Sequence, residues 1–183
     1  MATTTKTLMT ADELLDRSSE LGRCELIRGE LIKTTPAGAD HGDITMELAR
    51  QIANHVRKHK LGKVYSAETG FILERDPDTV READIPFVCA DRVPDRPMPG
   101  FFVGAPDLAV EVLSPNDRAS EVAEKVDLWL RCGARRVWVV DPKRHTVIVH
   151  RDPKNAQTLH KDDTLDGEDL LPGFSLKVSD IFA

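Results

Sequence analysis

The chain has 183 residues, of which 40% are hydrophobic and 31% are charged, and its formal net charge is −6. This size and composition are typical of a single globular domain over residues 1–183, and the acidic charge argues against a protein that coats nucleic acid non-specifically. No apolar run reaches the roughly 20 residues of a membrane span. Three cysteines without paired spacing predict free thiols in a cytoplasmic protein: Cys24, Cys89 and Cys132.

The first part of the chain predicts two short elements and one long helix. A capping-box pattern begins a short helix over residues 10–17. Residues 24–33 have the pattern of a hairpin with glycine in the turn. Apolar residues at every fourth position predict an amphipathic helix over residues 43–60, and residues 64–73 follow as a strand or a bent hairpin.

Two strands that carry acids come next. Residues 81–88 predict a strand containing Asp84, and its Pro86 favours an edge position or a bulge. Residues 107–114 predict an apolar strand buried on both faces, whose two acids point to the same face because side chains alternate. Buried carboxylates are costly unless a cation meets them. We therefore expect a divalent metal ion, which takes hard oxygen ligands, at these acids.

The remaining elements complete a mixed fold. A helix with an apolar stripe follows Pro115 and ends at Gly133, and residues 136–140 predict a buried strand with a hairpin partner at residues 145–150. The C-terminal tail predicts extended segments that close over the core. The order helix, strand, strand, strand, helix, strand over residues 40–142 predicts an α/β (mixed α+β) sandwich with helices on the sheet faces.

Several phrases of the sequence carry a resemblance to a known family: residues 25–29, His41, residues 81–84, residues 104–115, Lys125, Gly133, residues 137–142 and residues 171–174. With the αβββαβ order, they resemble the PD-(D/E)XK nuclease superfamily and, more narrowly, the Uma2 (DUF820) family. The resemblance implies a restriction-endonuclease-like core with an added N-terminal hairpin and C-terminal strands. It also implies hydrolysis of DNA with Mg²⁺ or Mn²⁺ as the cofactor.

The resemblance assigns roles to the acids of the two strands. Asp84 and Glu111 would be the catalytic acids and, together with the backbone carbonyl of Val112, the ligands of the metal ion. Asp107 at the entrance of the second strand is a further catalytic candidate, although an Asp after proline commonly makes hydrogen bonds of a turn. The alternative for Asp84 and Glu111 is a set of salt bridges, with partners among Arg81, Lys125 and Arg118.

The sequence departs from the family pattern at two positions. Ala83 stands where the family has proline, and Leu113 stands where a lysine is expected two residues after the second acid. The family pattern suggests that the lysine has moved to the following helix, where Lys125 is the candidate. Lys125 lies at the edge of the apolar stripe, so its amine could reach back over the sheet. There it would orient water and stabilise developing negative charge.

Weaker candidates have an ordinary structural interpretation beside the functional one. Glu25 could join the acids, but a solvated charge in the hairpin is favoured. His41 could meet a phosphate, but a role at the end of its helix is favoured, and Ser114 is slightly favoured as a turn cap over a phosphate contact. A basic cluster could contact nucleic acid, or could simply stabilise the C-terminus of a helix: Arg57, Lys58, Lys60 and Lys63.

Two function classes follow from these observations. The first is a Mg²⁺-dependent endonuclease with DNA as its substrate and no membrane partner. The second is a nuclease fold that has lost turnover and serves as a binding or interaction module; the acidic net charge favours it. By analogy, cleavage of both DNA strands suits a homodimer with two sites related by a two-fold axis.

Overall fold

The computed structural model describes residues 8–183, and the described chain begins with two short helices and a hairpin. The helices are α1 (Ala11–Asp16) and α2 (Ser18–Leu21), and the hairpin joins β1 (Cys24–Ile27) to β2 (Glu30–Lys33). Thr10 caps α1: its hydroxyl accepts the Glu13 N–H at 3.2 Å, and the Glu13 carboxylate accepts the Thr10 N–H at 2.8 Å. The predicted capping box and hairpin are therefore present, whereas α2 was not expected.

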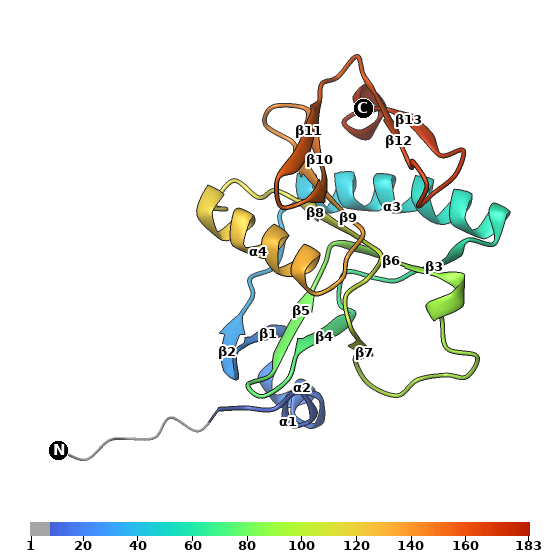
Figure 1. The fold of residues 1–183 in the computed structure, drawn as a ribbon. Coiled ribbons are helices and arrows are strands. Elements are labelled where there is room, and N and C mark those ends of the chain that lie inside the picture. Colours follow the sequence, from blue (N-terminus) through green and yellow to red (C-terminus); the bar gives the residue numbers. More distant parts are fainter. Residues whose placement is uncertain (1–7) are drawn as a thin grey trace.

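Two sheets organise the rest of the molecule. A five-stranded sheet has the order β2-β1-β5-β4-β7, and a six-stranded sheet has the order β11-β10-β9-β8-β6-β3 (Figure 1). Strands β12 and β13 form a separate pair near the C-terminus. The strands are β3 (Gly62–Val64), β4 (Gly70–Glu74), β5 (Thr79–Glu82), β6 (Ile85–Cys89), β7 (Phe102–Val103), β8 (Leu108–Val112), β9 (Arg136–Asp141), β10 (Thr146–Asp152), β11 (Asn155–Leu159), β12 (Thr164–Asp166) and β13 (Ser175–Lys177).

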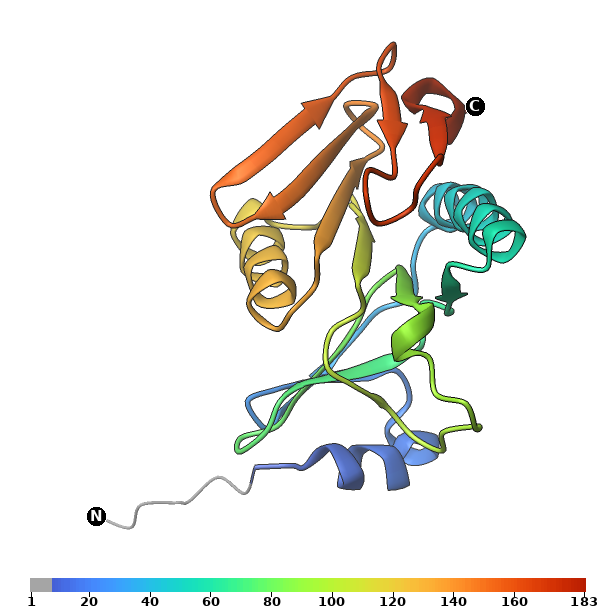
Figure 2. The same cartoon turned by 45° about the vertical axis from the view of Figure 1, so that its right-hand side comes forward.

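The two long helices lie on opposite faces of the six-stranded sheet. These are α3 (Ala39–His59) and α4 (Ala119–Arg131), and Figure 2 shows the sheet between them, with α1 and α2 against the five-stranded sheet. Along β8 the predicted alternation holds. Its residues 108, 110 and 112 pack with α3, while residue 109 packs with Val126 and Trp129 of α4. The predicted mixed α/β architecture with helices on the sheet faces is confirmed.

Asp84 lies between strands rather than within one. The prediction of a single strand over residues 81–88 is wrong, because β5 ends at Glu82 and β6 begins at Ile85, in different sheets. β5 pairs with β1 and β4, whereas β6 pairs with β3 and β8. The chain must therefore bend at Ala83 and Asp84 to change neighbours.

Pro86 occupies an interior strand, so the expectation of an edge strand is also wrong. It lies opposite Ala109 in the pairing of β6 with β8. On the other side, β3 pairs only as far as Val64, opposite Phe87. The Pro86 carbonyl accepts the Tyr65 N–H at 2.9 Å. In a strand, the N–H and C=O groups of one residue point toward the same neighbouring strand. The N–H that Pro86 lacks would therefore point toward β3, at a position beyond the end of that strand.

Both long helices begin at other residues than the apolar pattern predicts. Helix α3 begins at Ala39 rather than Asp43. The apolar pattern could not predict this first turn, because none of its residues is buried in the core. His41 therefore lies inside the first turn. Helix α4 begins at Ala119, after a turn in which the Asp117 carboxylate accepts the Ser114 N–H at 2.7 Å.

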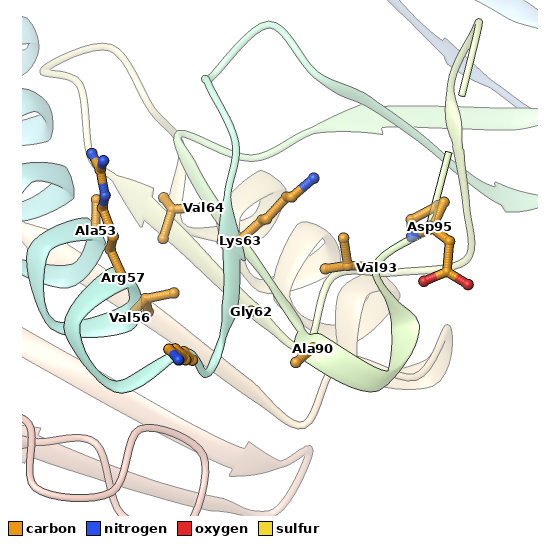
Figure 3. Close-up of a pocket in the computed structure, with 11 residues that line it drawn as sticks. Ala53, Val56, Arg57, Gly62, Lys63, Val64, Ala90, Val93 and Asp95 are labelled. Carbon is orange, nitrogen blue, oxygen red and sulfur yellow. The ribbon is translucent and has the colours of Figure 1, made fainter. Parts of the chain in front are cut away.

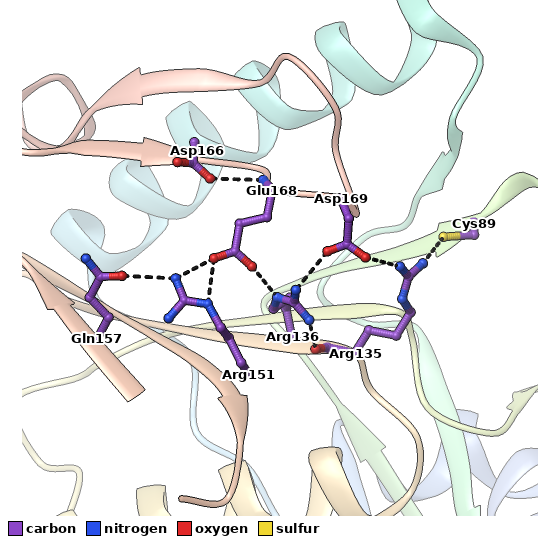
Figure 4. Close-up of polar contacts among 8 residues, drawn as sticks. All are labelled: Cys89, Arg135, Arg136, Arg151, Gln157, Asp166, Glu168 and Asp169. Carbon is purple, nitrogen blue, oxygen red and sulfur yellow. Dashed lines mark hydrogen bonds and ion pairs between the residues drawn. The ribbon is translucent and has the colours of Figure 1, made fainter. Parts of the chain in front are cut away.

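The C-terminal segment closes over the core beside α3, as predicted, and is fixed there by ion pairs. Its side chains at Leu165, Leu171 and Phe174 belong to the same apolar cluster as α3. Glu168 and Asp169 bind three arginines: Arg135 directly before β9, Arg136 in β9 and Arg151 in β10 (Figure 4).

The remaining elements are two short 3₁₀ helices, η1 (Ala90–Arg92) and η2 (Val178–Ile181). Within residues 8–183 no helix is both long and apolar enough to cross a membrane, and the three cysteines are free thiols.

Candidate functional site

The two principal acids belong to adjacent parts of the six-stranded sheet: Glu111 lies in β8, and Asp84 directly precedes β6, the neighbour of β8. Ile85 of β6 pairs with Val110 of the antiparallel strand β8. Continuing that register by one residue sets Asp84 opposite Glu111. The Asp84 Oδ2 atom accepts the Val112 N–H at 2.8 Å, so the bend before β6 is tied directly to the end of β8.

Glu111 is held by two residues of α4. Its Oε2 accepts a hydrogen bond from Lys125 Nζ at 2.7 Å, and its Oε1 accepts one from Trp129 Nε1 at 2.7 Å. Lys125 and Trp129 are one helical turn apart, on the side of α4 that faces β8. Lys125 therefore reaches back over the sheet as predicted. Trp129 is fully buried, and a buried indole N–H usually requires an acceptor, which Glu111 provides here.

The electrostatics of this pair depend on burial. Burial raises the pKa of Glu111 to about 7; the Lys125 charge opposes this rise, and the negative charge of Asp84 adds to it. Burial would lower the pKa of the Lys125 ammonium, but the charges of Glu111 and Glu25 raise it above its ordinary value. Lys125 is thus a cation at neutral pH. A single lysine does not fully offset the cost of burying Glu111 beside Asp84.

His41, in the first turn of α3, contacts Asp84, a contact that the sequence analysis did not predict. Its Nε2 lies 3.3 Å from Asp84 Oδ2. The hydrogen bond to Asp84 raises the pKa of His41 against the effect of burial, and the Val112 carbonyl raises it further. Burial by itself would raise the pKa of Asp84, but His41, the Val112 N–H and Lys125 lower it below its ordinary value. The early start of α3 brings His41 to this position.

Glu25 is buried rather than solvated, so the favoured interpretation as a hairpin charge in water is wrong. Its Oε1 accepts the Glu82 N–H at 2.9 Å and lies 3.2 Å from Arg81 Nε. Its charge acts on Lys125, so Glu25 belongs to the surroundings of the acid pair. Arg81 pairs with Glu25 instead of Asp84 or Glu111, and Arg118 pairs with Glu121 at 3.8 Å.

Two other candidates lie outside this cluster. Asp107 and Glu111 share a face of their strand but stand roughly 13 Å apart along it. The Asp107 Oδ2 atom accepts the Cys89 N–H at 2.8 Å and lies 3.0 Å from an Arg92 nitrogen, so it anchors the loop before β8. Ser114 takes part in the turn before α4 through its backbone, and the capping carboxylate comes from Asp117.

The predicted basic cluster lies at the far end of α3. His41 and Arg57 are separated by roughly 24 Å along the helix at about 1.5 Å per residue. Arg57, Lys60 and Lys63 line a pocket of about 570 Å³ with Val56 and Val64 (Figure 3). In the part of the chain that the structure describes, these cations form no ion pair. The structure does not bring them to the acid pair.

The donor set at the acids fits a hard divalent cation. Asp84, Glu111 and the Val112 carbonyl offer oxygen atoms of the kind that Mg²⁺ binds, and Mg²⁺ is usually held by one or two carboxylates while it keeps several waters. The raised pKa of Glu111 marks a place where further positive charge is favourable. Across residues 8–183, no three His, Cys, Asp or Glu side chains gather as ligands of one ion. The set is thus that of an open site rather than a closed metal cage.

A larger cavity of about 830 Å³ lies between α4 and the β9–β10 hairpin. His41, Leu113 and Ser114 line one part of it, and side chains of α4 and of the hairpin line the rest. Of the residues at the acid pair, His41 lines the cavity, whereas Asp84, Glu111 and Lys125 do not.

Comparison with known proteins identifies relatives of the whole chain. The family model described as "Uma2: Putative restriction endonuclease" matches residues 11–179. The fold is similar to the crystal structure of a "putative nuclease belonging to DUF820" from Anabaena variabilis ATCC 29413, with 23% sequence identity and a TM-score of 0.81. The match covers 95% of this chain and 97% of that one, which confirms the expected restriction-endonuclease-like fold. No curated protein matches the chain.

Proposed function

This chain belongs to the Uma2 family, and we propose that it is a Mg²⁺-dependent endonuclease that hydrolyses phosphodiester bonds of DNA. One observation carries the proposal: Lys125 Nζ lies 2.7 Å from Glu111, and the next residue, Val112, donates its N–H to Asp84. An acid pair with a lysine amine beside it is the constellation that the PD-(D/E)XK superfamily uses. In this chain the lysine comes from α4, and it would replace the lysine that the family pattern expects at the position of Leu113.

The residues that would hold the ion are Asp84, Glu111 and the carbonyl of Val112. When bound, Mg²⁺ or Mn²⁺ would polarise the phosphate and lower the pKa of a water molecule. His41 and the Val112 N–H orient the Asp84 carboxylate, and Trp129 orients Glu111.

Lys125 would act through its charge. Because its pKa is raised, the amine stays protonated at neutral pH and does not serve as a general base. Its ammonium would stabilise negative charge that develops on the phosphate. Glu111 fixes the ammonium in place, so this donor is already oriented before the substrate arrives.

The alternative is a module that binds without turnover. The net charge of −6 and the distance between the basic cluster and the acids favour it. A retired site, however, would be free to lose a buried Glu111, whose burial costs free energy. Retention of the acids together with Lys125 supports the enzyme.

Incubation of supercoiled plasmid with the protein in Mg²⁺, in Mn²⁺ and in EDTA tests the proposal. We expect nicked or linear DNA with either metal, none in EDTA, and none with Glu111→Gln or Asp84→Asn. Glu124→Gln is the matched control, since it removes an exposed acid from the same helix as Lys125. Absence of cleavage by the wild-type protein in both metals would contradict the enzyme and favour the binding module. Linear product without a nicked intermediate would support a two-fold dimer.

A further inference from the structure

Arg81 is a largely buried cation with a hydrogen-bond donor that is not used. Its side chain is 14% exposed, and its Nε atom is buried without a hydrogen-bond partner. Among residues 8–183 its polar contact is the ion pair with Glu25, in which Nε lies 3.2 Å from Oε1 without forming a hydrogen bond. Buried donors are nearly always satisfied, so this one requires an explanation.

Pairing with Glu25 explains the charge of Arg81 but not its donors. The register of β1 with β5 sets Leu26 opposite Val80, and hence Glu25 opposite Arg81. The same Glu25 oxygen already accepts the Glu82 N–H at 2.9 Å. A guanidinium carries five N–H donors in a planar fork. An ion pair alone would therefore use little of what this side chain offers.

The course of the chain brings Arg81 toward the acid pair. Arg81 lies in β5, three residues before Asp84, and the chain bends between them from β5 to β6. An anion that contacts the Arg81 guanidinium would give it the acceptor that Glu25 does not. Phosphate is the anion that a guanidinium fork matches best, because it can accept two parallel hydrogen bonds.

We propose that Arg81 binds a phosphate of the nucleic-acid substrate beside the acid pair, and that Glu25 positions the Arg81 guanidinium for this contact. The inference rests on the proposed function for the identity of the substrate. It makes Glu25 a positioning residue rather than a ligand of the metal ion. It also adds Arg81 to the residues that touch the substrate.

Binding of a fluorescein-labelled DNA duplex, measured by anisotropy in EDTA over a range of salt concentrations, tests this inference without any cleavage. Arg81→Met should weaken binding by roughly ten-fold or more, as expected for a lost charge-assisted contact. The slope of log affinity against log salt should decrease by about 0.9, the value for one phosphate contact. Arg50→Met is the matched control, because Arg50 is paired with Glu47 on an exposed part of α3. It should change neither the affinity nor the slope.

A double variant separates the phosphate contact from a purely structural role. Arg81→Met alone leaves Glu25 buried and unpaired, so it should lower the melting temperature. Glu25→Gln/Arg81→Met removes both charges and should melt closer to the wild type, yet bind DNA as weakly as Arg81→Met. Binding and salt slope restored to wild-type values in the folded double variant would overturn the inference.

The outcomes for this inference and for the proposed function are distinct. If the protein binds DNA through Arg81 but cleaves none in Mg²⁺ or Mn²⁺, the phosphate site is supported and the enzyme is contradicted. If the protein cleaves DNA and Arg81→Met changes neither affinity nor KM, the enzyme is supported and the phosphate site is overturned.

Discussion

At the scale of single residues, Glu111 is the most constrained acid of the site. It lies at the end of a strand buried on both faces, and both of its carboxylate oxygens accept hydrogen bonds from α4. These hydrogen bonds favour the ionised form, whereas burial and Asp84 favour the protonated form and raise the pKa to about 7. The ionisation of this side chain should therefore be visible in the stability of the metal-free protein.

We expect the contribution of Glu111 to the free energy of unfolding to fall as pH rises from about 4.5, the ordinary pKa of a glutamate, to about 7. Over this range the folded protein keeps a proton on Glu111 that the unfolded chain has lost, so rising pH favours unfolding. Glu111→Gln cannot ionise and should lack this contribution. Urea unfolding in EDTA, below pH 4.5 and above pH 7, measures the difference. If the difference in unfolding free energy between the wild type and Glu111→Gln does not grow with pH, the raised pKa of Glu111 is contradicted.

Replacing Lys125 by methionine separates the roles of the lysine and the acids. The change leaves Glu111 with one donor fewer in a buried place, and we expect a loss on the order of 2 kcal/mol in the unfolding free energy of the metal-free protein. Turnover should fall by roughly 10²-fold or more, as for the loss of one preorganised charged donor. The affinity for Mn²⁺, measured by titration calorimetry, should be unchanged or slightly higher.

Lys177→Met is the control for this prediction, since Lys177 is exposed on β13. It should alter neither stability nor turnover. A Lys125→Met protein that unfolds like the wild type and still cleaves DNA at the wild-type rate would show that another residue provides the charge.

At the scale of elements, the acids at the two ends of strand β8 make different contacts. Its exit carries Glu111, whereas the residue before its entrance, Asp107, ties the segment that precedes β8 to β6 and η1. The structure thus separates two acids that the sequence places on the same face of one strand. This separation predicts that changes at the two acids have different consequences.

Asp107→Asn should reduce stability without reducing metal affinity. The substitution weakens the contacts of the buried Asp107 carboxylate with the Cys89 N–H and with Arg92. We expect a loss of about 1–3 kcal/mol, because a hydrogen bond to a buried charged group is weakened. Mn²⁺ titration calorimetry should give the wild-type affinity, while Asp84→Asn should weaken binding strongly. If both variants lost metal binding to the same degree, Asp107 would belong to the site after all.

At the scale of the whole molecule, ion pairs hold the C-terminal segment on the six-stranded sheet. Glu168 accepts a hydrogen bond from Arg136 Nε at 2.6 Å and one from Arg151 Nε at 2.6 Å, and Asp169 binds Arg136 at 2.8 Å (Figure 4). Burial would raise the pKa of Glu168, but its two arginine partners lower it below the ordinary value. The network joins the last part of the chain to β9, which neighbours β8, and to β10.

Glu168→Gln should loosen this segment while the site remains intact. The change removes the charge from two arginine contacts at once, so amide hydrogen exchange should become faster in residues 164–182. The amides of β8 should keep their protection, because β8 is paired on both sides by β6 and β9. Asp180→Asn, which alters an exposed acid of the same segment, is the control. Faster exchange in β8 with Glu168→Gln would show that the segment supports the site itself.

Hydrophobic pattern predicted β8 and α4, the two elements that carry Glu111 and Lys125. The alternation along β8 placed Glu111 on the same face as Ala109, and the spacing of α4 placed Lys125 at the edge of the apolar stripe. Such patterns are local, because side-chain direction in a strand or helix follows from backbone periodicity. The mixed fold was therefore predictable from the sequence, whereas the pairing of Asp84 with Glu111 and the role of Lys125 were expected only from the resemblance to the family.

Contacts between distant segments were decided only by the tertiary structure. His41 meets Asp84 because α3 begins before its apolar pattern does, and Glu25 is buried because the first hairpin packs beside β5. Trp129 donates its N–H to Glu111. Arg81 of β5 lies opposite Glu25 of β1 in the five-stranded sheet. None of these contacts has a local signal, since each depends on how two elements pack and not on the period of either. The sequence by itself determined the elements and the acid pair, and packing between elements determined which charges surround that pair.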